Sequence, residues 1–332
     1  LNKEVDNNKF SVGDIYAAKI RKPISGLNAA FVGVGHEKDG FLHYHDLGPN
    51  LATLLKFFKL VSSGRTKNYS LKNFRFEKEI PKDGSIQDYL KPQQQILVQI
   101  VKEPISTKGP RVSSELSLAG RFMVLIPFSD RISISQKIES NAEKSRLKKL
   151  VKSIRPKGFG VIIRTVAKDQ KVKELEADLH QLLGRWKNLC EKFVKVDQYP
   201  TKILSEINRS SSILRDIFDN DFSGIHVDDP EMQSEIKDYL KTIAPDKASI
   251  VKYFKNKSIP IFDHFGVERQ IKTSFGKTVS MQKGAYLVIE HTEALHVIDV
   301  NSGNRSNKAK SQEQTALEVN LIAASEIARQ LR

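Results

Sequence analysis

Hydrophobic and polar positions alternate along short runs in the first third of the chain, and Gly, Asn and Asp separate these runs. The runs cover residues 14–20, 28–35, 39–44 and 94–102. Alternation with a period of two, bounded by turn-forming residues, predicts β-strands. Short strands in this arrangement indicate a small barrel of the OB type. We therefore expect residues 10–104 to form a barrel domain, with an insertion at 48–90 between its third and fourth strands.

The insertion at 48–90 mixes basic and aromatic residues. Its basic members are Lys56, Lys59, Arg65, Lys67, Lys72, Arg75 and Lys78, and its aromatic members include Phe57, Phe58, Phe74 and Phe76. A basic, polar stretch of this kind is most often a solvated loop. An additional nucleic-acid surface is the alternative.

Downstream of the barrel, the apolar period lengthens to that of helices, with strands between them. A capping box at Ser140 and Glu143 predicts a helix that Pro156 and Gly158 end. A long amphipathic helix is expected at 171–193, a helix at 205–218, another from Asp229, and strands at 160–165, 224–228, 285–290 and 295–300. The pattern therefore predicts a multidomain chain that combines α/β regions with the β-barrel.

Composition narrows the range of partners. The 332 residues carry 54 Lys and Arg against 39 Asp and Glu, a net charge of +15. A broad positive field favours polyanions, and nucleic acid above membranes. No apolar run approaches the roughly 20 residues that a bilayer requires, and no signal-peptide pattern opens the chain. The single cysteine, Cys190, excludes a disulfide framework within the chain and is typical of a reducing, cytoplasmic compartment.

Two polar stretches at strand ends are candidates for chemistry. Asp299 and Asn301 end the strand at 295–300, where a carboxylate could hold a divalent cation. The alternative, favoured by this short segment alone, is an Asx turn. Arg164 and Thr165 end the strand at 160–165, where the guanidinium could bind a terminal phosphate. The alternative for a lone arginine is a structural salt bridge.

Phe31 and Phe41 lie on neighbouring predicted strands in a lysine-rich setting. In an OB barrel, such aromatic side chains stack on the bases of single-stranded nucleic acid. The alternative is that both phenylalanines belong to the barrel core. The pattern by itself does not decide between these two interpretations.

Taken together, these stretches resemble the catalytic half of the ribonuclease E/G family. The matching motifs are NAAFV at 28–32, DGFL at 39–42, SLAG at 117–120, VLIP at 124–127, GVIIRT at 160–165, TEAL at 292–295, IDVNS at 298–302 and the helix at 320–332. They follow the family's order along nearly the whole chain. The insertion and the stretch PISTKGP at 104–110 are closer to the ribonuclease G type.

The resemblance implies an architecture of four parts. An S1 (OB) barrel at 10–104 would be followed by a 5′-sensor region at 105–197. A ribonuclease H-like subdomain without activity of its own would take 198–266, with a remnant at 1–9. A deoxyribonuclease I-like catalytic subdomain would begin at residue 267. We expect the chain to be cut at both ends, because it begins with Leu1 and because Arg332 lies inside a helical pattern.

The resemblance also assigns roles to individual residues. Asp299 matches a metal-binding aspartate and Asn301 the asparagine beside it, and together they would form the catalytic site with Mg²⁺. The 5′-monophosphate pocket would consist of Arg164, Thr165, Gly120 and Val124. The residues that hold single-stranded RNA would be Phe31, Phe41, Lys102 and Lys108.

These roles imply a magnesium-dependent endoribonuclease that cleaves single-stranded RNA, prefers a 5′-monophosphate and acts in rRNA processing and mRNA decay. The full-length protein would be a homo-oligomer, a dimer or tetramer. The family's second metal aspartate, and the cysteine pair that links ribonuclease E protomers through zinc, would lie beyond Arg332, so we expect this fragment to bind RNA without necessarily cleaving it. The alternative is a non-catalytic S1-type RNA-binding module of a ribosome- or decay-associated protein.

Overall fold

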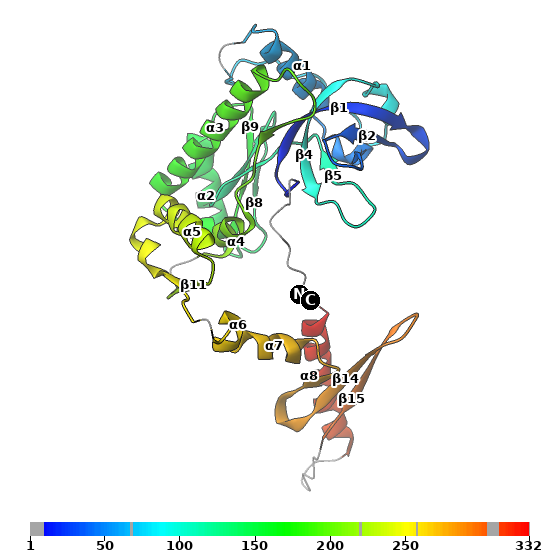
Figure 1. The fold of residues 1–332 in the computed structure, drawn as a ribbon, viewed down its shortest axis with the longest axis vertical. Helices are drawn as coiled ribbons and strands as arrows, with labels where there is room; N and C mark the ends of the chain where they lie inside the picture. The colour runs from blue at the N-terminus through cyan, green and yellow to red at the C-terminus, as the bar shows by residue number, and fades with distance from the viewer. Residues whose placement is uncertain (1–9, 67–68, 219–220, 257, 304–311, 332) are drawn as a thin grey trace. The chain divides into compact units, whose positions relative to one another are not determined.

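A computed structural model describes residues 10–66, 69–218, 221–256, 258–303 and 312–331 (Figure 1). The chain forms two compact units. The first comprises residues 1–223 and 238–247, and the second comprises residues 224–237 and 248–332. The expected remnant at 1–9 and Lys67 of the insertion lie outside the described residues.

A closed five-stranded barrel opens the first unit and confirms the OB-like expectation. Its strands are β1 (Ile15–Ile24), β2 (Ala29–Gly33), β3 (Gly40–His43), β4 (Gln95–Lys102) and β5 (Arg111–Ser113). The strand order is β1-β2-β3-β5-β4, and pairing of β1 with β4 closes the barrel. Strand β5 lies beyond residue 104, the expected end of this domain. Strand β10 (Thr201–Leu204) adds to the outer edge of β1.

The length of β1 explains how the barrel closes. Its first half pairs with β4, from Ile15 to Lys19, and its second half pairs with β2. The register shifts between Ile20 and Lys22, and such an irregularity bends a strand so that a sheet can curl on itself. Alternate side chains such as Val32 and Leu42 point inward and are fully buried.

The insertion at 48–90 is not simply a solvated loop. Helix α1 (Leu51–Ser62) occupies its first part, and Phe57 and Phe58 are buried there. Both rings contact Trp186, at centroid distances of 5.6 and 5.9 Å. The aromatic residues of the insertion therefore belong to the core. The lysines of this stretch suggested a loop, but the stretch contains an amphipathic helix.

The α/β region that follows contains a four-stranded sheet with two helices. Its elements are β6 (Leu118–Ala119), β7 (Met123–Pro127), β8 (Ile132–Ile134), α2 (Asn141–Ile154), β9 (Phe159–Ile163) and α3 (Val172–Val194), in the sheet order β6-β7-β9-β8. Helix α3 packs against β6 and β7 (Figure 1). The predicted cap is confirmed, because the Ser140 hydroxyl accepts a hydrogen bond from the Glu143 amide at 3.3 Å.

Two further helices complete this part of the chain. Helix α4 (Arg209–Ile217) starts later than the expected residue 205, because the side chain of Asn208 caps it by accepting from the Ser211 amide at 2.8 Å. Helix α5 (Pro230–Ile243) starts at the predicted proline. Proline is favoured at the first helical position, where its missing N–H costs no hydrogen bond.

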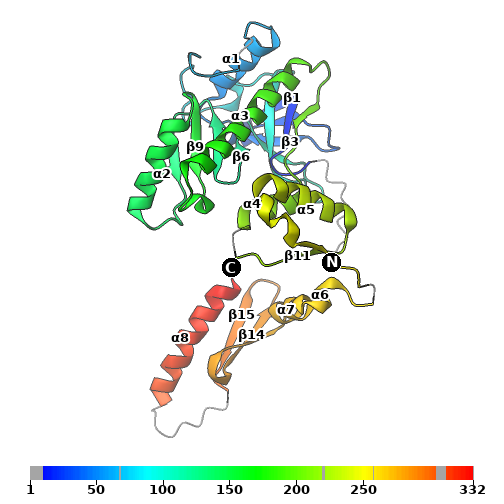
Figure 2. The ribbon, with the colours of Figure 1, turned by 90° about the vertical axis from the view of Figure 1, so that its left-hand side faces the viewer.

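The second unit contains two small sheets. Strands β11 (Ile225–Val227) and β12 (Val251–Tyr253) are parallel, and helices α6 (Ile261–His264) and α7 (Val267–Ser274) follow them. Strands β13 (Thr278–Ser280), β14 (Tyr286–His291) and β15 (His296–Asn301) form an antiparallel sheet with β15 at its edge. Helix α8 (Gln312–Gln330) lies along this sheet (Figure 2).

The side of helix α8 that packs against the sheet is narrower than the apolar stripe in its sequence. Val319 and Ala323 are buried, and Ala323 shares a small cluster with Leu287 of β14. The leucines of the more apolar stripe, Leu317 and Leu321, are 63% and 66% exposed. Small side chains on the packed side let the helix lie close to the sheet.

The helices of the described ranges include none long and apolar enough to cross a membrane. The longest is α3, and its buried leucines occupy one side only. Its Cys190 is fully buried, and burial raises the pKa of the thiol far above its ordinary value. A thiol kept neutral in this way is a poor nucleophile and metal ligand.

The burial of α1 leads to a first prediction. Replacing Leu54, a residue of α1 that is 3% exposed, with Ala should lower the free energy of unfolding by about 2–5 kcal/mol. The matched variant Leu27→Ala removes a 55% exposed leucine and should change it by less than about 0.5 kcal/mol. Urea unfolding followed by the fluorescence of Trp186, the single tryptophan, measures both. Equal effects would show that α1 is not part of the core.

Candidate functional site

A groove on the barrel brings together the four residues expected to hold RNA. It has a volume of about 670 Å³, and Phe31, Phe41, Lys102 and Lys108 all line it. Strands β2 and β3 supply the phenylalanines, the end of β4 supplies Lys102, and the loop between β4 and β5 supplies Lys108. Residues far apart in the sequence therefore converge on one surface.

The two phenylalanines face this groove and not the barrel core. They lie directly opposite each other on paired strands, with ring centroids 6.2 Å apart at an interplanar angle of 66°. Their neighbours Ala30 and Leu42 point the other way and are fully buried, whereas both rings are partly exposed. The alternative that Phe31 and Phe41 are core residues is therefore wrong.

Charge in the groove is predominantly positive. Lys102 and Lys108 lie exposed on its rim. Arg111 also lines it, but its guanidinium is held by both carboxylate oxygens of Asp46, at 2.8 and 3.1 Å. The hydrogen bonds that Arg111 donates to Asp46 raise the pKa of Arg111 above its ordinary value. The lysines are therefore the groups best placed to meet a mobile phosphate chain.

The loop carrying Lys108 is folded tightly over the groove. A β-bridge joins Ile105 to Lys108, and Ser106 takes a positive φ of 51° between them. A Cβ atom added to Gly109 would lie 2.2 Å from the carbonyl oxygen of Asp39. Only glycine allows this close approach of two backbones, and that approach fixes the position of the neighbouring lysine.

The residues expected to recognise a 5′ end lie around the β6–β7 turn and the end of β9. We call Gly120, Val124, Arg164 and Thr165 the end-recognition cluster. Arg164 donates from Nη1 to the Gly120 carbonyl oxygen at 2.9 Å. Thr165 shares a hydrogen bond with the Ser135 hydroxyl at 2.9 Å. Val124, on β7, pairs with Ile162 of β9 and is partly exposed. The structure thus brings these side chains to one edge of the sheet.

Arg164 also makes an ion pair with a partner that the sequence pattern did not identify. Its Nη2 lies 2.6 Å from Oδ1 of Asp216, in the last turn of α4. Arg215 Nε binds the same carboxylate oxygen at 3.1 Å. Burial raises the pKa of Asp216, but the hydrogen bonds from these two arginines outweigh burial, so its pKa lies below the ordinary value. The salt bridge considered as the alternative for Arg164 is therefore present.

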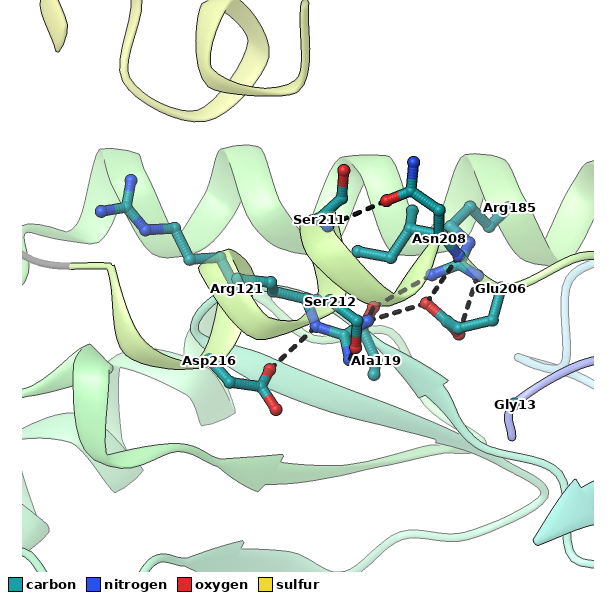
Figure 3. A network of polar contacts seen from close by, with 12 residues as sticks. Gly13, Ala119, Arg121, Arg185, Glu206, Asn208, Ser211, Ser212 and Asp216 are labelled. Atoms are coloured by element: carbon teal, nitrogen blue, oxygen red, sulfur yellow. Dashed lines mark hydrogen bonds and ion pairs between the residues drawn. The ribbon is translucent and has the colours of Figure 1, made fainter. Parts of the chain in front are cut away.

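A second carboxylate, Glu206, anchors α4 to the sheet. It accepts from Arg215 at 2.8 Å and from Arg185 at 3.3 Å. Arg185 in turn donates to the Ala119 carbonyl oxygen at 3.0 Å, beside Gly120 (Figure 3). The Glu206 side chain is only 7% exposed, so this pairing is structural.

Asp178 of α3 fixes the turn before β7. Its carboxylate accepts hydrogen bonds from the backbone amides of Arg121, Phe122 and Met123 at 2.9, 2.9 and 3.1 Å. Burial raises its pKa, although the three amides oppose this shift. Asp178 was not among the predicted site residues, although a charged residue on the apolar side of an amphipathic helix is a sequence signal for such a buried role.

Asp299 and Asn301 lie on the exposed face of the edge strand β15. Asn301 donates from Nδ2 to Asp299 Oδ2 at 2.8 Å. Their neighbour Ile298 points to the other face and packs toward α8. Over the described ranges, no group of three or more His, Cys, Asp or Glu side chains comes together. One exposed carboxylate with an amide beside it suits Mg²⁺, which keeps several waters and takes few protein ligands.

A closed OB-like barrel with an aromatic and basic groove, joined to α/β regions, defines a multidomain protein of the oligonucleotide-binding barrel class. Residues 117–332 match the sequence profile of the Ribonuclease E/G family. The chain belongs to this family, and the resemblance noted from its motifs is confirmed.

Individual relatives cover almost the whole chain. Ribonuclease E of Synechocystis sp. (strain ATCC 27184 / PCC 6803 / Kazusa) is 34% identical over 331 residues, 99% of this chain and 45% of that protein. Ribonuclease G of Haemophilus influenzae is 33% identical over 324 residues, 97% of this chain and 61% of the relative. Ribonuclease G of Escherichia coli (strain K12) is 30% identical over 321 residues, with the same coverages. The chain thus spans about half the length of these relatives, and its similarity to the two types is nearly equal.

The tight packing around Asp178 predicts opposite outcomes for two glycine variants. In Gly120→Ala the new Cβ would lie 2.6 Å from Asp178 Oδ1, so the free energy of unfolding should fall by about 1–3 kcal/mol. In Gly184→Ala, an exposed position in α3, the Cβ meets nothing within 4 Å and helix propensity should add about 0.5–1 kcal/mol. Chemical denaturation distinguishes the two. A neutral Gly120→Ala would show that Asp178 does not constrain this turn.

Proposed function

We propose that the protein to which this chain belongs is an endoribonuclease that binds single-stranded RNA along the barrel groove and prefers a 5′-monophosphate. The observation that carries the proposal is the convergence of Phe31, Phe41, Lys102 and Lys108 on one groove. Family membership and relatives named as ribonucleases support the choice of RNA and of hydrolysis.

The groove suits unpaired bases better than a duplex. Two aromatic rings at the floor offer stacking surfaces, and lysines on the rim offer partners for phosphates. Stacking on an aromatic side chain contributes about 1–3 kcal/mol per base and is tolerant of sequence. Bases inside a duplex already stack on each other, so only a single strand gains this energy. The groove would thus hold the strand without reading its sequence.

The end-recognition cluster supports a second contact at the 5′ end. Arg164 presents a planar guanidinium, which can fork onto two oxygens of a terminal phosphate. Gly120 holds the guanidinium through its carbonyl oxygen, Val124 offers a partly exposed apolar surface, and Thr165 adds a hydroxyl. An RNA strand that is bound both at its 5′ end and in the groove keeps more affinity for the protein, when one contact is weak, than a strand bound at one place only.

The cleavage step is assigned to Asp299 and Asn301. Asp299 would hold Mg²⁺, while Asn301 orients its carboxylate through the 2.8 Å hydrogen bond. When bound, the ion would supply positive charge at the scissile phosphate and lower the pKa of a coordinated water. The strand position of both residues keeps them on a rigid element, which precise metal binding requires.

Binding can be tested separately from cleavage. Phe31→Ala should weaken binding of a short single-stranded RNA by about 1–3 kcal/mol, because one stacking surface is lost. The control Phe275→Ala removes an 88% exposed phenylalanine from outside the groove and should leave the affinity unchanged. Fluorescence anisotropy with a labelled RNA gives both constants. An unchanged affinity for Phe31→Ala would remove the groove from the proposal.

Catalysis has its own test. Asp299→Asn should abolish magnesium-dependent cleavage while RNA affinity stays at the wild-type value, since the exposed carboxylate has no role in the groove. Asp263→Asn, which neutralises an exposed carboxylate of α6, is the control and should cleave normally. Cleavage by Asp299→Asn would overturn the assignment. Binding without cleavage in the unmodified full-length protein would favour the non-catalytic RNA-binding module instead.

A further inference from the structure

A carboxylate of the chain itself occupies Arg164, the arginine assigned to the terminal phosphate. We infer that Asp216 is a placeholder for that phosphate: it pairs with Arg164 in the free protein, and only a 5′ end with more than one negative charge displaces it. The inference deepens the proposed function and depends on the 5′-end role of Arg164. It names Asp216 as a residue that determines specificity for a terminal monoester.

The contacts of Arg164 show how the two anions would compete. Its Nη1 is committed to the Gly120 carbonyl oxygen at 2.9 Å, which fixes the side chain against the β6–β7 turn. Its Nη2 faces Asp216 Oδ1 at 2.6 Å. Of the two terminal nitrogens of the guanidinium, Nη2 is the one not bound to Gly120, and in our inference the phosphate takes this Nη2 from the carboxylate. Binding of the phosphate requires this ion pair to open.

Exposure indicates that opening this pair costs little. The Asp216 side chain is 44% exposed, whereas Glu206 in the same network is 7% exposed and bridges Arg185 and Arg215. Glu206 is therefore the fixed anchor and Asp216 the accessible carboxylate. Figure 3 shows Asp216 and Glu206 at separate points of this network. Water reaches the Asp216 carboxylate of this pair, and ion pairs that are open to water contribute little net stability.

Arg215 provides a partner for Asp216 after displacement. Its Nε lies 3.1 Å from Asp216 Oδ1, and its Nη1 stays bound to Glu206 at 2.8 Å. When Arg164 turns to a phosphate, the released carboxylate keeps one charged hydrogen bond and its solvent contact. Removing one partner of an ion pair is costly mainly when the other charge is left buried and alone, and that situation does not arise here.

The position of Asp216 within α4 supports a role beyond helix stability. It is the penultimate residue of the helix, where the negative end of the helix dipole disfavours a carboxylate. Asn at the same position would keep the side-chain shape and avoid that repulsion. The acidic residue is thus unfavourable for the helix alone and is stabilised there by the two arginines.

Charge then decides which RNA ends are accepted. A terminal phosphomonoester carries about −1.5 to −2 near neutral pH, more than the single charge of Asp216. A phosphodiester carries only one negative charge and gains nothing over the carboxylate, and a hydroxyl end carries none. Asp216 would in this way prevent internal phosphates of the RNA from occupying Arg164.

The experiment compares three versions of one short RNA on the intact chain: a 5′-monophosphate, a 5′-methyl phosphate and a 5′-hydroxyl. In the wild type only the monophosphate should bind more tightly than the hydroxyl. In Asp216→Asn the monophosphate should bind up to about fivefold more tightly than in the wild type, and the methyl phosphate should now also exceed the hydroxyl. Affinity for the hydroxyl RNA should not change.

Three controls separate this role from others. Asp130→Asn removes a carboxylate from another arginine pair in the same region, with Arg155, and should behave as wild type. Asp216→Glu keeps the charge and should restore the discrimination against the methyl phosphate. Thermal unfolding of Asp216→Asn should match that of the wild type, which excludes loss of fold.

Each result bears on a different claim. If Asp216→Asn lowers the monophosphate affinity, Asp216 positions Arg164 and the placeholder role is overturned. If the methyl phosphate still binds like the hydroxyl, the role is overturned as well. If the wild type does not distinguish the three ends, and Arg164→Ala changes nothing, the 5′-end role itself fails. If Arg164→Ala abolishes the preference for the monophosphate, but Asp216→Asn changes neither the monophosphate affinity nor the methyl phosphate affinity, only the placeholder inference fails.

Discussion

Burial of Trp186 is the interaction on which the first unit depends. Phe57, Phe58, Phe128 and Phe159 surround its indole with centroid distances between 5.6 and 5.9 Å, and the indole N–H donates to the Tyr69 carbonyl oxygen at 2.9 Å. These rings come from the insertion, from the four-stranded sheet and from the loops beside it. Aromatic pairs in such edge-to-face and tilted arrangements add directional energy to area burial. The insertion, the four-stranded sheet and the outer side of β1 and β4 therefore share one core, while the side chains inside the barrel form a separate cluster.

Next to this aromatic core, carboxylates hold backbone amides and arginine side chains in place. Asp178 satisfies three amides of the turn at residues 121–123, and Glu206 ties α4 to Ala119 through Arg185. Both carboxylates are nearly buried, and each is fully supplied with donors, as buried charges must be. Asp216 differs because it is half-exposed and bound by arginines on one side only. The same residue type thus acts as a fixed anchor or as an exchangeable partner, according to burial.

Much of this architecture could be predicted from local patterns. The four first strands, the capping box at Ser140 and the long helix α3 follow from period and turn chemistry, which act over a few residues. The groove residues were found as motifs, but whether Phe31 and Phe41 face outward required knowledge of which strand side meets the core. Helix α1 was missed because lysines on its solvent side masked the buried Phe57. Arg164 and Asp216 lie 52 positions apart in the sequence (216 minus 164). A local sequence pattern cannot predict a contact between residues so far apart.

The residues proposed for RNA binding and those proposed for cleavage lie in different compact units. The groove and the end-recognition cluster both lie in the first unit, and Asp299 lies in the second, on a small sheet with its own cluster of Leu287 and Ala323. Each of the two sites is supported by a hydrophobic cluster of its own unit. RNA affinity and cleavage should therefore respond to different residues. In the proposed function, the strand is bound by its end and its bases in the first unit, and the metal ion assigned to Asp299 serves cleavage alone.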